Sequence, residues 1–134
     1  MGRQKYLIDT NVAIDYIGQV LPEEILTVLD SIIDNTFYIS VINKIELLGF
    51  SNITKKEEIK FQEFINAANV IELNDDVVNK TIYIRRQRKV KLPDAIIAAT
   101  AGVYDLVLLS RNDKDFKKID DLILINPMDL PDKS

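Results

Sequence analysis

The sequence predicts an α/β fold in three layers, with helices on both faces of a mainly parallel sheet of about four or five strands. Short apolar runs alternate along the chain with segments of helical periodicity. Runs such as residues 6–8 and 107–109 have no polar face, which is typical of buried strands in parallel sheets. A chain of 134 residues can bury a sizeable core. We therefore expect one domain over residues 1–134.

The sequence lacks both cysteine and histidine, and these two absences limit the chemistry that the protein can perform. There is no cysteine, which excludes disulfides, thiol nucleophiles and thiolate metal ligands. There is no histidine, which removes the commonest general base and the commonest zinc ligand. An enzyme built from the remaining residues would rely on carboxylates, hydroxyls and lysines. An all-oxygen site selects hard cations such as Mg²⁺ or Mn²⁺.

The charge and hydropathy of the sequence limit the kinds of partner and the cellular location that we expect. The net charge is −4 and the isoelectric point is near 4.8. These values argue against binding nucleic acid by bulk charge, but they leave room for a local basic face. No apolar run approaches the length of a membrane span, and the first residues lack the apolar core of a signal peptide. We expect a soluble, cytoplasmic protein.

The first strand is expected at residues 5–8, and the acid that follows it, Asp9, would lie at the carboxyl end of this strand. A helix should follow from near residue 11 to residue 18, with Thr10 favoured over Asp9 as its N-cap. Pro22 fits the first position of the next helix, which extends to about residue 34.

The second strand, at residues 37–40, leads directly into a helix over 41–48 that ends at Gly49. This helix carries Glu46, which by itself is more easily interpreted as a solvated glutamate than as a functional acid. The apolar stripe expected on the helix consists of Val41, Ile45 and Leu48.

A capping box formed by Thr54 and Glu57 begins a helix that leads to a third strand at residues 70–73. Asn74 or Asp75 would cap the long helix that comes next. Its far end is basic, which either complements the helix dipole on a solvated face or contacts phosphates. The cations are Arg85, Arg86, Arg88, Lys89 and Lys91.

A nearly uncharged helix is expected over residues 92–102, with Pro93 at its first position and Asp94 in its first turn. Asp94 is the only acid on this helix, although a helix dipole favours an acid there without any further role. Strands should follow at residues 107–110 and 122–125. The polar cluster after the first of them contains Asn112, Asp113 and Asp115.

Carboxylates are expected to converge at one edge of this sheet. Because the carboxyl ends of parallel strands face one edge, Asp9 and the cluster after residue 110 would emerge together, near Asp94 and Glu46. Crowded carboxylates raise one another's pKa unless a divalent cation neutralises them. One or two such ions can activate a water for attack on a phosphodiester, and this chemistry needs no histidine.

Four segments then form an ordered pattern. They are Asp9-Thr10-Asn11-Val12, Ile45-Glu46-Leu47-Leu48, residues 92–101 around Asp94, and residues 109–116. Together they resemble the PIN-domain family, and within it most closely the VapC-type toxins of toxin–antitoxin pairs. The resemblance spans the whole chain, and the ordered set is far more specific than any one motif. It implies a PIN-like fold and an endoribonuclease that depends on Mg²⁺ or Mn²⁺.

The resemblance also implies roles for individual residues. Asp9 and Asp94 match the two best-defined metal ligands of the family, and Glu46 matches its third acid. These acids would therefore form the catalytic and metal-binding site. The expected supporting residues are the hydroxyls of Thr10 and Ser110, together with Asn11, which would orient Asp9 or bind a water.

The fourth acidic position of the family lies just past the strand that ends at Ser110. This chain offers Asn112, Asp113 and Asp115 there. Asp113 is preferred as the fourth catalytic and metal-binding acid, with Asp115 and Asn112 as alternatives. If the amide of Asn112 holds the position, a second metal ion would bind more weakly.

The partners that the resemblance implies are an RNA substrate, a second copy of the chain in a homodimer, and a cognate antitoxin whose C-terminal segment covers the acidic cleft. No membrane is implied. The basic stretch 85–91 immediately precedes Asp94, so we expect it to guide the RNA backbone towards the metal.

Three other interpretations compete with this one. A phosphoaspartate enzyme of the haloacid dehalogenase type also has an acid after its first strand, but it needs a second aspartate at the position of Asn11. A PIN-like module could bind RNA or protein without cleavage, although the presence of Asp9, Glu46 and Asp94 counts against this. A DNA-directed nuclease is the third, because the metal chemistry does not recognise the sugar.

Overall fold

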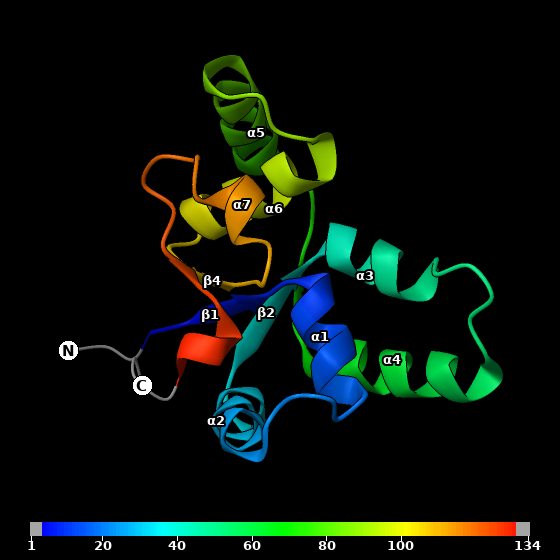
Figure 1. Cartoon of the computed structure of the whole chain (residues 1–134). Coiled ribbons are helices and arrows are strands. Elements are labelled where there is room, and N and C mark those ends of the chain that lie inside the picture. The colour runs from blue at the N-terminus through cyan, green and yellow to red at the C-terminus, as the bar shows by residue number, and fades with distance from the viewer. Residues whose placement is uncertain (1–3, 131–134) are drawn as a thin grey trace.

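The computed structural model describes residues 4–130, which form a five-stranded sheet with helices around it (Figure 1). The strands are β1 (Tyr6–Ile8), β2 (Phe37–Ser40), β3 (Asn69–Ile71), β4 (Val107–Leu109) and β5 (Leu124–Ile125). Their order across the sheet is β3-β2-β1-β4-β5, and all neighbouring pairs are parallel. The predicted α/β class with a parallel sheet is confirmed. The predicted single domain over residues 1–134 extends beyond the described residues at both ends.

The helices connect the strands as right-handed crossovers require in a parallel sheet. They are α1 (Thr10–Ile17), α2 (Glu23–Asp34), α3 (Val41–Leu48), α4 (Lys55–Ala67), α5 (Asp75–Gln87), α6 (Leu92–Val103) and the short α7 (Asp113–Phe116), followed by a 3₁₀ turn, η1 (Pro127–Asp129). Among residues 4–130, no helix combines the length and the apolar character needed to cross a membrane.

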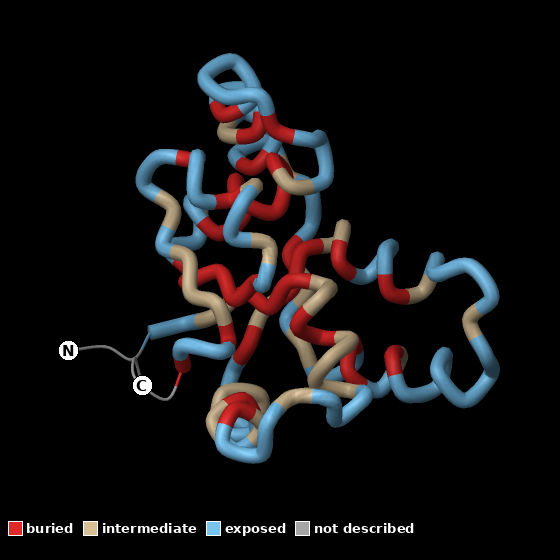
Figure 2. The backbone as a smooth tube through the Cα atoms, viewed as in Figure 1, coloured by how far each residue is buried: buried red, intermediate tan, exposed pale blue. Residues whose placement is uncertain are grey.

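Both faces of the sheet are buried, so the predicted three layers are present. Side chains alternate along each strand: Leu7 and Leu108 belong to the core beneath α5 and α6, whereas Ile8 and Leu109 belong to the core beneath α1, α2 and α4. Figure 2 shows the central strands and most of α6 as buried. The lack of charge along α6 follows from this position between the sheet and α5.

The order of the strands reverses direction between β1 and β4, which are neighbours although a hundred residues separate them. Ile8 pairs with Leu109, and the backbone N–H of Asp9 donates to the carbonyl of Leu109 over 3.0 Å. The chain leaves β1 towards one face and reaches β4 from the other. In open α/β sheets such a point forms a crevice at the carboxyl ends of the strands, and ligands bind there.

One predicted helix face is wrong. In α3 the fully buried residues are Asn43 and Leu47, whereas Ile45 of the predicted stripe is 61% exposed. The cause is the direct junction of β2 and α3, where Ser40 ends the strand and caps the helix. This junction turns Asn43 inwards, because its side-chain oxygen accepts the N–H of Ser40 over 2.8 Å.

Helix starts differ slightly from those predicted. Asp9, not Thr10, is the N-cap of α1, and its carboxylate accepts the N–H of Thr10. Pro22 is the N-cap of α2 rather than its first residue, and Pro93 is the second residue of α6. A proline is tolerated anywhere in this region because the first N–H groups of a helix have no partner within it.

Other boundaries follow the sequence more closely. The capping box of Thr54 and Glu57 is present at α4, and Asn74 caps α5 by accepting the N–H of Val77. The sheet edges are shorter than expected: β3 ends at Ile71 and β5 begins only at Leu124. The one-turn helix α7 was not predicted.

Candidate active site at the carboxyl edge of the sheet

Asp9 follows the carboxyl end of β1, where the strand order reverses, and is only 5% exposed. One of its carboxylate oxygens accepts the N–H of Thr10 at 2.9 Å and the amide of Asn43 at 3.3 Å. The other accepts the hydroxyl of Ser110 at 2.7 Å and the amide of Asn11 at 3.3 Å. The carboxylate is thus held from β1, α1, α3 and the end of β4 at once, which fixes its orientation.

Glu46 is connected to Asp9 through a chain of hydrogen bonds. The amide of Asn43 donates to the Thr10 hydroxyl at 3.0 Å, and this hydroxyl donates to Glu46 Oε1 at 2.6 Å. Because a side-chain NH₂ group can only donate, it leaves the Thr10 proton directed at the glutamate. Glu46 is exposed at its position on α3, but this bond holds its carboxylate on the side of Asp9.

The segment after β4 is fastened to α1. The Ser110 hydroxyl accepts the N–H of Asn112 at 3.0 Å, and Asn11 accepts the N–H of Arg111 at 3.1 Å. The Arg111 guanidinium also forms an ion pair with Asp15, at 2.8 Å. These contacts hold the segment between β4 and α7 against α1.

The pKa values of Asp9 and Asp94 are both raised, in part by neighbouring acids. Burial raises the pKa of Asp9 above its ordinary value, and the charges of Glu46 and Asp94 raise it further, while the bonds from Ser110 and Thr10 oppose this. Burial is also the main reason why the pKa of Asp94 is raised. Negative charge on Asp115 and Glu46 adds to this effect, and Lys91 lowers the pKa of Asp94.

Of the candidates for the fourth acid, Asp115 is the one whose charge raises the pKa of Asp94. Asp113, preferred from the sequence, is exposed, and its carboxylate accepts a hydrogen bond from Asn126 at 3.4 Å. Two residues along a helix are about 200° apart around its axis, so the two acids of α7 face different sides. Asn112 lies just before α7, and its backbone N–H donates to the Ser110 hydroxyl, which itself donates to Asp9. This arrangement favours Asp115.

We call Asp9, Glu46, Asp94 and Asp115 the acidic cluster. Its side chains suit a hard divalent cation, because every candidate ligand atom is an oxygen. Among residues 4–130, no three carboxylates are close enough to bind one ion together. Mg²⁺ commonly uses only one or two protein carboxylates and keeps several waters. The two bonds of 3.3 Å to Asp9 are its longest, so they are the easiest to exchange for an ion. The residues therefore fit an ion that is partly bound through water.

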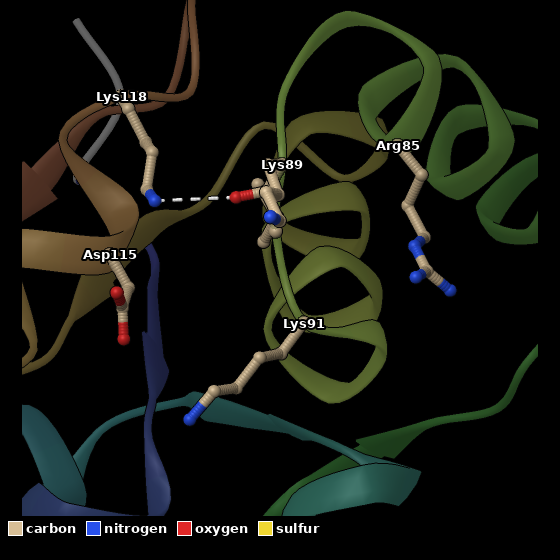
Figure 3. Close-up of a pocket in the computed structure, with 6 residues that line it drawn as sticks. Arg85, Lys89, Lys91, Asp115 and Lys118 are labelled. Atoms are coloured by element: carbon tan, nitrogen blue, oxygen red, sulfur yellow. Dashed lines mark hydrogen bonds between the residues drawn. The ribbon is translucent and has the colours of Figure 1, made fainter.

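The predicted basic residues do not all line the same pocket. Arg85, Lys89 and Lys91 line a pocket together with Lys118, which the sequence did not single out (Figure 3). Arg86 does not line this pocket. Arg88 does not line the pocket either; its guanidinium donates to the backbone carbonyl of Lys118 at 2.9 Å and pairs with Asp120 at 3.5 Å.

Asn43 is the main residue of the cluster that the sequence analysis missed. Its signal was its position three residues after Ser40, which is the spacing of a capping box, but with Asn in place of the usual Glu or Gln. Lys118 gave no such signal, because it lies among other lysines in an irregular segment.

Fold and site together define a doubly wound α/β domain with an acidic cluster at the switch point of its sheet. Residues 6–122 match the family model of the PIN domain, so the chain belongs to the PIN domain family. The predicted family is thereby confirmed.

Several solved structures are similar to this chain. A chain of VapBC2 from Rickettsia felis, bound to a promoter DNA fragment, has a TM-score of 0.78 at 24% identity, covering 92% of this chain and 98% of that chain. A toxin–antitoxin complex from Klebsiella pneumoniae gives 0.73 at 29% identity, with coverage of 91% and 97%. FitAcB from Neisseria gonorrhoeae gives 0.73 at 25%, with coverage of 92% and 98%. No curated protein matches the sequence significantly.

Proposed function

We propose that this protein is a metal-dependent endoribonuclease and the toxin of a VapBC-type toxin–antitoxin pair. The observation that carries the proposal is the gathering of Asp9, Glu46 and Asp94 at the switch point. Burial and the negative charges of neighbouring acids raise the pKa values of Asp9 and Asp94, and the Thr10 hydroxyl connects Glu46 to the hydrogen bonds around Asp9. Repulsion of this kind is relieved by a divalent cation. Membership of the PIN domain family and the likeness to a toxin–antitoxin complex support the same function.

In this proposal each acid has a separate task. Asp9 and Asp94 hold Mg²⁺ or Mn²⁺, and Asp9 does so in an orientation fixed by its four donors. Glu46, aligned by the Thr10 hydroxyl, and Asp115 orient waters around the site. The ion, when bound, supplies a positive charge for the phosphate and lowers the pKa of a water. The half-buried position of Asp94 leaves one side of the cluster open to substrate.

The proposal includes protein partners. A cognate antitoxin would cover the acidic cluster, and the exposed Ile45, next to Glu46 on α3, offers an apolar contact beside it. A second copy of the chain would form a homodimer, for which α5 presents the exposed apolar residues Val78, Ile82 and Tyr83. RNA and such an antitoxin place the protein in the cytoplasm.

A cleavage assay with purified protein tests this function. We expect the protein to cut single-stranded or loop-containing RNA in Mg²⁺ or Mn²⁺, and to stop cutting when a chelator is added. Asp94→Asn removes one ligand with little change in shape, and it should lower the rate at least about a hundredfold, as the loss of a main electrostatic contributor does elsewhere.

The matched control is Asp105→Asn. It makes the same change of charge at an exposed residue beyond the end of α6, where asparagine suits the left-handed backbone (φ 58°). Cleavage by Asp94→Asn at the wild-type rate would contradict the proposal. Cleavage of DNA but not of RNA with the same sequence would favour the DNA-directed nuclease, and RNA binding without cleavage would favour the non-catalytic module.

A further inference from the structure

A pocket of about 400 Å³ lies beside the acidic cluster (Figure 3). We call it the lysine pocket. It is lined by Arg85, Lys89, Val90, Lys91, Asp115 and Lys118. Four of these side chains are cations and one is a carboxylate, which leaves a surplus of three positive charges in a protein whose net charge is −4. The basic character is therefore concentrated here against the overall charge of the molecule.

The wall of the lysine pocket is made of two segments that hold each other. The ammonium group of Lys118 donates to the backbone carbonyl of Lys89 at 3.3 Å, and Arg88 donates to the backbone carbonyl of Lys118 at 2.9 Å. The loop after α5 is thus joined to the segment after α7. An ammonium group has three donors, so this contact leaves Lys118 able to bind an anion.

Two residues of the lysine pocket act electrostatically on Asp94. Asp115 lines the pocket and raises the pKa of Asp94, whereas Lys91 lines the pocket and lowers it. In Figure 3 the Lys91 side chain extends towards the side on which Asp115 lies, while Arg85 is at the opposite rim. A polyanion bound in the pocket could therefore continue directly to Asp94.

We propose that the lysine pocket binds a backbone phosphate of RNA next to the phosphate that is cleaved. This rests on the proposed function, and it assigns Lys89, Lys91 and Lys118 as the residues that hold the neighbouring phosphate. Cations placed beside an acidic cluster attract the charged backbone and keep it near carboxylates that would otherwise repel it. Arg88 is not assigned this role because it does not line the pocket.

RNA fits these observations better than an acidic protein segment. Phosphates recur along a nucleic acid, so one chain can occupy the pocket and the acidic cluster together. An acidic peptide would also gain from the pocket, but the hard cation of the proposed function is commonly bound by carboxylates together with substrate phosphates, so the neighbouring site favours a phosphate. The sequence of the RNA is not recognised by such contacts, because phosphates carry no base information.

The test is the binding of a fluorescent single-stranded RNA of mixed sequence to the full-length protein in EDTA, measured by anisotropy at several salt concentrations. Lys118→Gln and Lys89→Gln should each weaken binding by about threefold to fivefold. Each should also make the slope of log Kd against log salt concentration shallower by about 0.7, because one fewer phosphate is neutralised. Lys118→Arg, which keeps the charge, should retain most of the affinity.

Matched controls are available in the chain. Lys117→Gln makes the same change of charge at the neighbouring exposed lysine, which does not line the pocket, and Arg86→Gln does so beside Arg85. Both should bind RNA nearly as the wild type does, and thermal unfolding verifies that all variants fold. Equal losses in Lys117→Gln and Lys118→Gln would overturn the proposal, since the effect would then be one of general charge.

Three further outcomes separate this proposal from others. If Lys118→Gln weakens the binding of oligoglutamate as much as that of RNA, the pocket serves an acidic protein segment and the proposal fails. Because the binding assay contains no metal, its result does not depend on cleavage. Normal cleavage with unchanged RNA binding by both pocket variants would reject the lysine pocket alone, whereas selective loss of binding in a protein that never cleaves would reject only the nuclease function.

Discussion

The side-chain amide of Asn43 donates to the hydroxyl of Thr10 over 3.0 Å, and thereby directs the Thr10 proton to Glu46. Asn43 is fully buried, and its other end accepts the N–H of Ser40. One uncharged side chain thus links the end of β2, the N-terminus of α1 and the acids of the crevice. A polar residue in the core serves here to position charges at the edge.

Asn43→Ala should destabilise the protein although alanine favours helices. The change leaves the buried N–H of Ser40 without its acceptor and removes the donors to Asp9 and Thr10, which should cost about 1–3 kcal/mol. Urea unfolding gives the free energy. The control, Asn66→Ala, alters an exposed asparagine of α4 and should have almost no effect. Equal free energies of unfolding for the two variants would show that the hydrogen bonds of Asn43 do not stabilise the protein.

In the metal-free protein, the stability that Asp9 and Asp94 contribute should fall as the pH rises above about 3.8. The pKa values of Asp9 and Asp94 are raised from 3.8 in the folded state, so the native protein keeps protons that the unfolded chain has already released. Their contribution is complete below pH 3.8 and disappears as the pH passes the folded-state pKa values.

Asp94→Asn isolates this effect from the other carboxylates. The variant lacks the penalty for charging Asp94, so its free energy of unfolding should increase relative to that of the wild type as the pH rises from about 4 to 7. Urea unfolding in EDTA at several pH values measures the difference. A difference that does not change with pH would mean that burial and neighbouring charges do not raise the pKa of Asp94 in the folded protein.

Asp115 and Asp113 can be distinguished without an activity assay. Asp115→Asn should lower the pKa of Asp94, because a repelling charge is removed, whereas Asp113→Asn should leave it unchanged. Carboxyl-detected NMR titration of the metal-free protein follows Asp94 directly. A larger shift in Asp113→Asn would return the fourth acid to the residue preferred from the sequence.

Binding of Mn²⁺ or Mg²⁺ should stabilise the folded protein. An ion at one hundred times its Kd adds about 2.7 kcal/mol to the free energy of unfolding. Thermal unfolding with and without the ion should therefore reveal a rise in Tm for the wild type and for Asp105→Asn. A similar rise in Asp9→Asn would place the ion elsewhere.

Much of the fold could be predicted from the sequence because strand and helix periods are local signals. Residues 107–109 are apolar on both faces and are the buried strand β4. The acids at strand ends followed from a general property of parallel sheets, and the structure brings Asp9, Glu46 and Asp94 within electrostatic reach.

What could not be predicted depends on contacts between distant segments. The inward turn of Asn43 follows from the junction at Ser40, and hydrophobicity alone favoured Ile45 instead. Whether Asp113 or Asp115 influences Asp94 depends on the direction of the one-turn helix α7, and this helix was not predicted from the sequence. Lys118 reaches the site only because the segment after α7 is joined to the loop after α5.

The central claim is that Asp9 and Asp94 hold the ion that cleavage requires, and crystals grown or soaked in Mn²⁺ test it most directly. An anomalous manganese peak should lie at the switch point between β1 and β4, bonded to Asp9, to Asp94 or to both, with waters completing the shell of the ion. The peak should vanish in Asp94→Asn crystals. A fully occupied manganese ion bound away from both aspartates, or none at saturating Mn²⁺, would contradict the account.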